Sequence, residues 1–168
     1  MQRDAFTRWL EQHRPDSPPQ VYQPAGCLGG PPLGWQIVVG RTRFVYRVPP
    51  EAPHLFYIVL IERGPERHAL HSPFADMVRL LQLVQRSGAG LRWIRGHVEP
   101  TKQRPSDALT RERIIAFYRR YLTAVSTGFE HGREWYGGDI TTFSWNAEKR
   151  KIRARTIAAT AAPTPLLT

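Results

Sequence analysis

The run from His54 to Ile61 (HLFYIVLI) is the sequence feature that most constrains the fold. It is nearly all apolar, yet it is far shorter than the roughly 20 residues that a membrane-spanning helix needs. A short apolar run without polar alternation is typical of a strand that is buried on both faces. We therefore expect a central strand at this position, and the rest of the chain has to supply the elements that cover it.

Two further strands are expected immediately before this run. They extend from Trp35 to Val39 and from Thr42 to Val48, and they flank the pair Gly40-Arg41, a two-residue hairpin signal. A fourth strand is expected from Leu91 to Val98. The sequence thus predicts a sheet that begins with a hairpin and continues into the apolar run.

Three amphipathic segments predict helices. The first spans residues 3–13. The second begins after Ser72, which is a good N-cap, and has Pro73 at its first position, where a missing N–H costs nothing. The third spans residues 109–125 and has one wide apolar face and one basic face.

The elements follow the order α-β-β-β-α-β-α-β-β, which closes with a hairpin expected to pair residues 139–145 with residues 150–157. This order predicts a single α+β domain over residues 1–157, with helices packed on an antiparallel or mixed sheet. Residues 15–33 are rich in Pro and Gly and are expected to form an extended or mobile loop. Residues 158–168 are expected to form a flexible C-terminal tail.

The charge of the chain restricts the class of partner. With 24 basic and 14 acidic residues the net charge is +10, which favours an acidic protein, a nucleic acid or an anionic membrane surface. No recognition-helix or RNA-binding signature accompanies the charge, so an acidic protein is the preferred partner and a nucleic acid the alternative. The sequence leaves a homodimer open.

The same composition indicates a soluble, cytoplasmic protein. Cys27 is the single cysteine, which excludes an intramolecular disulfide. No signal peptide and no apolar run long enough for membrane insertion is present. The six histidines lack metal-ligand spacing and no phosphate-binding glycine motif occurs, so we expect no metal and no cofactor.

One pair of residues permits a catalytic interpretation. His71 would act as a base and Asp76, in the first turn of the second helix, would orient it. A carboxylate at a helix N-terminus also stabilises the helix dipole without any catalytic role. Because no nucleophile motif accompanies the pair, the dipole role is preferred and no catalytic residue is assigned.

Basic residues next to aromatic residues mark three segments that could bind a partner. Trp93 lies between two arginines in the fourth strand, the third helix carries basic residues beside tyrosines, and basic residues alternate along the last strand. Such side chains can hold anionic groups, although charge on an edge strand also discourages aggregation. The predicted contact residues are Trp93, Tyr118, Arg119, Arg120, Lys149, Lys151 and Arg153.

The segment from Gly34 onward resembles the low-calcium-response R (LcrR) family of bacterial type III secretion systems. The resemblance rests on the ordered motifs Ile58-Val59-Leu60-Ile61-Glu62-Arg63, Pro73-Phe74-Ala75 and Phe117-Tyr118-Arg119-Arg120, and on Leu10 near the N-terminus. It implies a cytoplasmic accessory protein that regulates secretion or chaperones a component by binding it. It implies no enzymatic activity.

A second resemblance is to the toxin-activating acyltransferases, which have a fold of the acetyltransferase kind. It rests on the segment His71-Ser72-Pro73-Phe74-Ala75-Asp76 after an apolar strand, with Asp76 at the matching position. The upstream histidine that the family uses is absent, since Leu10 and His13 are separated. This resemblance implies an acyltransferase-like enzyme as the alternative function.

Overall fold

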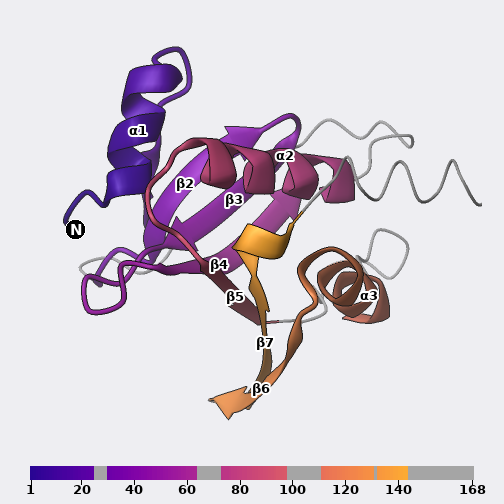
Figure 1. Ribbon diagram of the computed structural model, residues 1–168. Coiled ribbons are helices and arrows are strands. Elements are labelled where there is room, and N and C mark those ends of the chain that lie inside the picture. The colour runs from indigo at the N-terminus through magenta and orange to yellow at the C-terminus, as the bar shows by residue number, and fades with distance from the viewer. Residues whose placement is uncertain (25–29, 64–72, 98–110, 131, 144–168) are drawn as a thin grey trace, which may run out of the picture.

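The computed structural model describes residues 1–24, 30–63, 73–97, 111–130 and 132–143 (Figure 1). Within these residues, one seven-stranded sheet is packed against helices. The strands are β1 (Gln20–Tyr22), β2 (Gly34–Val39), β3 (Thr42–Arg47), β4 (Leu55–Arg63), β5 (Trp93–His97), β6 (Val125–Glu130) and β7 (Arg133–Asp139). The helices are α1 (Ala5–His13), α2 (Pro73–Arg86), α3 (Arg111–Leu122) and the 3-10 helix η1 (Ile140–Thr142).

The sheet has the strand order β1-β2-β3-β4-β5-β7-β6 and is mixed. Neighbouring strands are antiparallel except for β4 and β5, which are parallel and between which α2 lies in the sequence. The α+β class, the mixed sheet and the predicted element order are confirmed, with β1 as an additional short strand. The expected hairpin around Gly40-Arg41 is present, because β2 and β3 pair from Val39 and Thr42 onward.

All three α-helices lie on one face of the sheet, which we call the helix face (Figure 1). The ring of Phe6 in α1 packs on Tyr46 and Phe56. Asp76 in α2 accepts a hydrogen bond from the hydroxyl of Thr42. The register places Tyr46, Phe56 and Thr42 on the same face, because directly opposed residues of neighbouring strands point to the same side.

The third helix covers the other end of the same face. Gly96 of β5 pairs with Ile58 of β4 and Tyr136 of β7, and these two side chains are buried. The hydroxyl of Tyr118 in α3 lies where a Cβ atom on Gly96 would meet it, at 2.7 Å. The core therefore forms between the sheet and its helices. Ile94 and Gly96 of β5 face this core, whereas Trp93, Arg95 and His97 point to the opposite face of the sheet.

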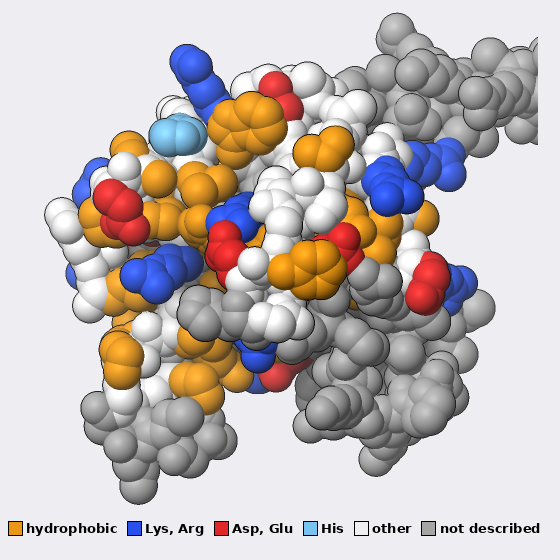
Figure 2. All heavy atoms as spheres, turned by 90° about the horizontal axis from the view of Figure 1, so that it is seen from below, with side chains coloured by type: hydrophobic (Ala, Val, Ile, Leu, Met, Phe, Trp, Pro, Cys, Tyr) orange, Lys and Arg blue, Asp and Glu red, His pale blue; other side chains and the backbone are white. Residues whose placement is uncertain are grey.

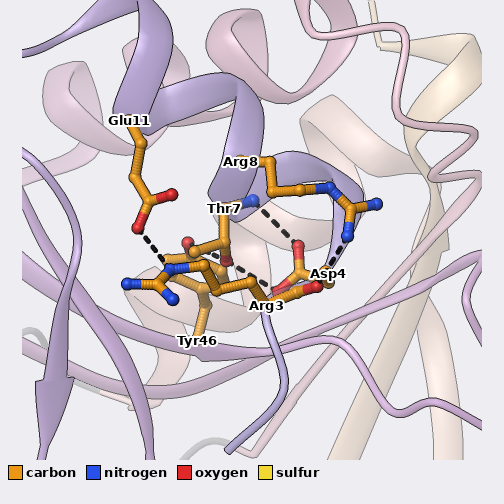
Figure 3. Close-up of polar contacts among 6 residues, drawn as sticks. All are labelled: Arg3, Asp4, Thr7, Arg8, Glu11 and Tyr46. Carbon is orange, nitrogen blue, oxygen red and sulfur yellow. Dashed lines mark hydrogen bonds and ion pairs between the residues drawn. The ribbon is translucent and has the colours of Figure 1, made fainter.

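A polar network anchors α1 to the sheet (Figure 3). Asp4 is the N-cap of the helix, and its carboxylate accepts hydrogen bonds from the backbone N–H and the hydroxyl of Thr7, at 2.9 and 2.7 Å. The Thr7 hydroxyl also lies 2.8 Å from the hydroxyl of Tyr46 in β3. Burial raises the pKa of Tyr46 well above its usual value, so this hydroxyl stays protonated and the network stays neutral at Tyr46.

Three local predictions differ from the structure. β1 lies inside residues 15–33, where a loop was expected, and it pairs with β2 at the edge of the sheet. The predicted last hairpin was wrong in position, because residues 125–130 and 133–139 form β6 and β7 while η1 occupies residues 140–142. Residues 150–157 and the expected tail at 158–168 lie outside the described residues.

The apolar run at His54 to Ile61 forms most of β4, at the centre of the sheet as predicted. Its burial nevertheless alternates in the first half, since Phe56 and Ile58 are 0% and 3% exposed while Tyr57 is only half-buried. The expectation that this strand is buried on both faces was therefore wrong for Tyr57, which points away from the helix face. The side chain of Tyr57 therefore lies on the face of the sheet that carries the candidate site.

Candidate functional site

On the face opposite the helices, β4, β5, β6 and β7 bring together the guanidinium of Arg95, several aromatic side chains and the carboxylate of Glu130. β5 contributes three alternating residues, and the register sets Tyr57 of β4 directly opposite Arg95 and Trp135 of β7 directly opposite His97. We call this group the Arg95 surface. Its members are Tyr57, Trp93, Arg95, His97, Thr127, Glu130 and Trp135.

The guanidinium of Arg95 donates three hydrogen bonds, one from each of its three nitrogen atoms. It donates to the Glu130 carboxylate at 2.5 Å, to the Thr127 hydroxyl at 3.2 Å and to the Tyr57 hydroxyl at 3.3 Å. Glu130 and Thr127 both belong to β6, which is separated from β5 by β7. Arg95 therefore reaches across β7 and fastens the edge strand to the body of the sheet.

Two aromatic rings also lie against this guanidinium. Its central carbon is 4.9 Å from the centroid of the Trp135 ring and 5.8 Å from that of Tyr57, distances at which a cation is attracted to an aromatic face. The two rings meet each other edge to face. The arginine side chain is 18% exposed, so aromatic packing and charge pairing combine to fix its position.

The electrostatics of the site keep Arg95 charged. Burial acts to lower the pKa of its guanidinium, but the hydrogen bonds to Glu130 and Tyr57 and the charge of Glu130 outweigh burial and raise that pKa. Glu130 is 49% exposed, so water screens this ion pair and its contribution to stability is modest. The surface therefore presents a fixed cation whose carboxylate partner is itself accessible to solvent.

Aromatic area beside the arginine is open to solvent. Trp93 is 49% exposed, at the opposite end of β5 from His97, whose ring centroid lies 5.2 Å from that of Trp135. The Nε1 atom of Trp135 is buried and has no hydrogen-bond partner among the residues that the structure describes. Tryptophan, tyrosine and arginine are the residue types that contribute most to the energy of protein interfaces.

The surface around the β6–β7 hairpin is mixed in character (Figure 2). Viewed from the end of the molecule at which this hairpin lies, acidic and basic side chains alternate with hydrophobic ones over the described area. Val125 and Phe129 of β6 are 65% and 72% exposed. This part of the molecule is neither a uniform basic patch nor a purely apolar one.

The alternative catalytic pair is not assembled in the described structure. Asp76 is fully buried, and its carboxylate accepts hydrogen bonds from the Thr42 hydroxyl at 2.8 Å, the Arg41 backbone N–H at 3.1 Å and the Arg79 guanidinium at 3.2 Å. It thus joins the first turn of α2 to the turn of the β2–β3 hairpin. His71 lies outside the described residues.

The predicted contact residues are distributed unevenly. Trp93 lies on the Arg95 surface, whereas Tyr118 is 2% exposed and is part of the core between α3 and β5. Arg119 and Arg120 are exposed in the last turn of α3, and the Arg120 guanidinium lies 5.4 Å from the ring centroid of Tyr121. Predicted contacts at Lys149, Lys151 and Arg153 fall outside the described residues.

Sequence reasoning missed Tyr57, Glu130 and Trp135. Tyr57 belongs to the apolar run that predicts a strand buried on both faces. Trp135 lies between the third predicted helix and the predicted last hairpin, where the sequence predicts no strand. The alternation of Arg133, Trp135 and Gly137, which share one side of β7, was a usable signal. The association of Arg95 with Glu130 depends on the order of the strands, which the sequence does not reveal.

The described part of the chain holds no group of three or more His, Cys, Asp or Glu side chains placed to bind a metal ion. None of its helices has the length and apolar character needed to cross a membrane. At the Arg95 surface the described polar side chains pair with one another, since Arg95 donates hydrogen bonds to Glu130, Thr127 and Tyr57.

Comparison with known proteins gives one family match. A model of the family described as type III secretion system regulator (LcrR) matches residues 3–151. No curated protein matches.

Solved structures give weaker matches, among them two proteins assigned to the GNAT acetyltransferase family. The protein from Desulfovibrio desulfuricans is 13% identical with a TM-score of 0.38, and the match covers 63% of this chain and 67% of that one. The protein from Streptococcus pneumoniae is 13% identical with a TM-score of 0.35, and the match covers 62% of this chain and 66% of that one.

Proposed function

We propose that this chain, which belongs to the LcrR family of type III secretion system regulators, regulates secretion by binding a protein partner through the Arg95 surface. The observation that carries the proposal is the half-exposed Trp93 beside an arginine that two aromatic rings and three hydrogen bonds hold in place. A guanidinium that is already held in place binds with little loss of side-chain entropy. This combination is typical of an interface centre.

The partner we propose is an acidic protein of the secretion system. The net charge of +10 supports this choice, because complementary charge accelerates encounter and excludes basic competitors. The same contact could serve regulation or chaperoning, and the two roles differ in the fate of the bound partner. A chaperone would keep that partner soluble before its export, and we include this role in the proposal.

We further propose that the chain acts without catalysis. The positions of the residues with a possible catalytic role support this view, since Asp76 is enclosed by Thr42, Arg41 and Arg79. The acyltransferase-like alternative would need this carboxylate to meet a substrate. Its contacts instead give it a structural role in joining α2 to a hairpin.

Co-purification from the native bacterium tests the proposal. A tagged chain should recover one acidic secretion-system protein, less of it as salt is raised, and Trp93→Ala should lower the recovery by about tenfold or more. Val38→Ala is the matched control, because Val38 is 47% exposed on β2, far along the sheet order from Trp93. Equal recovery by the Trp93 variant and the unaltered chain would contradict the proposal.

A further inference from the structure

The two edges of the sheet differ in how they are protected. β1, at one edge, has three residues and is preceded by Pro18 and Pro19 and followed by Pro24, features that blunt an edge against further pairing. β6, at the other edge, has six residues and contains neither proline nor a basic residue. Every residue of β6 is exposed, and no strand among the described residues pairs with its outer side.

The outer side of an edge strand carries backbone N–H and C=O groups that neighbouring strands normally pair. An extended peptide segment can pair with these backbone groups as an additional β-strand. The apolar side chains of Val125 and Phe129 are 65% and 72% exposed, which gives an added strand contacts besides its backbone. Because Val125 opposes Gly137 and Phe129 opposes Glu134, these contacts lie on opposite faces of the sheet.

The edge is held in an extended conformation before any partner binds. Arg95 donates hydrogen bonds to Thr127 and Glu130, two positions of β6. The register with β7 shifts between Ser126 and Gly128, so an added strand would pair on either side of this irregularity. A pre-ordered edge lowers the entropy that an incoming strand has to lose.

We propose that β6 binds an extended acidic segment of the protein partner by strand addition. Exposed arginines flank β6 in the sequence, since Arg119 and Arg120 lie in the last turn of α3 before it and Arg133 begins β7 after it. A second copy of this chain would bring the same net charge of +10 to the edge, which disfavours self-pairing. This inference rests on the proposed function and specifies how the partner of that surface is bound.

Two synthetic peptides with blocked ends test the proposal on the full chain. The first alternates Glu and Val over seven residues, and the second has the same charge with Pro in place of Val, which removes backbone donors and prevents strand pairing. With millimolar Glu-Val peptide, hydrogen exchange of β6 amides should slow by about tenfold, less at high salt. The Glu-Pro peptide should leave β6 unchanged, and the amides of β1 should respond to neither peptide.

Phe129→Ala provides a second measurement. Because this side chain is 72% exposed, the variant should fold normally and bind the Glu-Val peptide about three- to tenfold more weakly. Unchanged β6 exchange with the Glu-Val peptide, or equal slowing by both peptides, would overturn strand addition. If co-purification still depends on Trp93 in that case, the proposed function stands and only this mode of binding fails.

Discussion

The Arg95 guanidinium lies 2.5 Å from the Glu130 carboxylate and so connects β5 to the edge strand β6 across β7. This contact links the exposed aromatic area around Trp93 to the free edge of the sheet. Arg95 thus lies on the same face of β5 as Trp93 and also binds the edge strand, and variants at Trp93, Glu130 and Phe129 can separate the two features.

Glu130→Gln should loosen the edge strand without unfolding the domain. Since Glu130 is 49% exposed, the free energy of unfolding should fall by only about 1 kcal/mol or less. Amide exchange in β6 should nevertheless accelerate, because Arg95 loses its charged acceptor. Urea denaturation measures the first effect and site-resolved exchange the second, and unchanged exchange in β6 would show that Arg95 does not order this strand.

Asp76→Asn should destabilise the whole domain. In the variant an amide N–H₂ group replaces one oxygen of a buried carboxylate that now accepts hydrogen bonds from Arg41, Thr42 and Arg79. The free energy of unfolding, measured by urea denaturation, should therefore fall by about 2–4 kcal/mol. Thr42→Val should cost about 1–2 kcal/mol, and the two effects should be less than additive because they share one hydrogen bond. A stable Asp76→Asn variant that loses only its secretion phenotype would favour the catalytic interpretation.

Gly96→Ala should destabilise the packing of α3 on β5 in a way that a second change relieves. The added methyl group would meet the Tyr118 hydroxyl at 2.7 Å, at a side chain that is 2% exposed. We expect a loss of about 1–3 kcal/mol, most of it recovered when Tyr118→Phe removes the oxygen.

Gly138→Ala is the control for this pair. Its methyl group would meet the backbone oxygen of Leu122 at 2.5 Å, which Tyr118→Phe leaves in place. Thermal unfolding of the three single variants and the two double variants checks the prediction. Equal rescue at both glycines would mean that Tyr118→Phe stabilises the domain by another route.

Stability should depend on pH through Asp139. Hydrogen bonds from the side chain and backbone of Thr141 lower the pKa of this carboxylate below its usual value. A group whose pKa is lower in the folded state stabilises the fold above its unfolded pKa, and that contribution is lost as pH falls through the folded pKa. Asp139→Asn should therefore flatten the fall in melting temperature below about pH 4, and an unchanged profile would contradict this assignment.

Local signals in the sequence predicted the elements that have strong periodicity or capping. Pro73 and the apolar stripe that follows it predicted α2, and Gly40-Arg41 predicted the first hairpin. Strand β6 was missed because its six exposed residues show no apolar alternation, so Val125 was read as the end of a helix. Exposure at an edge removes the burial pattern on which strand prediction depends.

The candidate site could be predicted only in part for a similar reason. Trp93 and its arginine neighbours are close in sequence, and one strand presents Trp93 and Arg95 on the same face. Tyr57, Thr127 and Glu130 reach Arg95 from two other strands, and β7 is inserted between β5 and β6. Such contacts follow from tertiary strand order, which local sequence patterns do not contain.

Secretion by the native bacterium tests the central claim most directly. A strain that lacks the gene would be complemented with the unaltered chain, Trp93→Ala or Val38→Ala, and the secreted type III substrates would be quantified. We expect Val38→Ala to restore normal secretion and Trp93→Ala to behave like the deletion while its protein accumulates to normal levels with an unchanged melting temperature. Full complementation by Trp93→Ala would contradict the claim that this chain regulates secretion through the Arg95 surface.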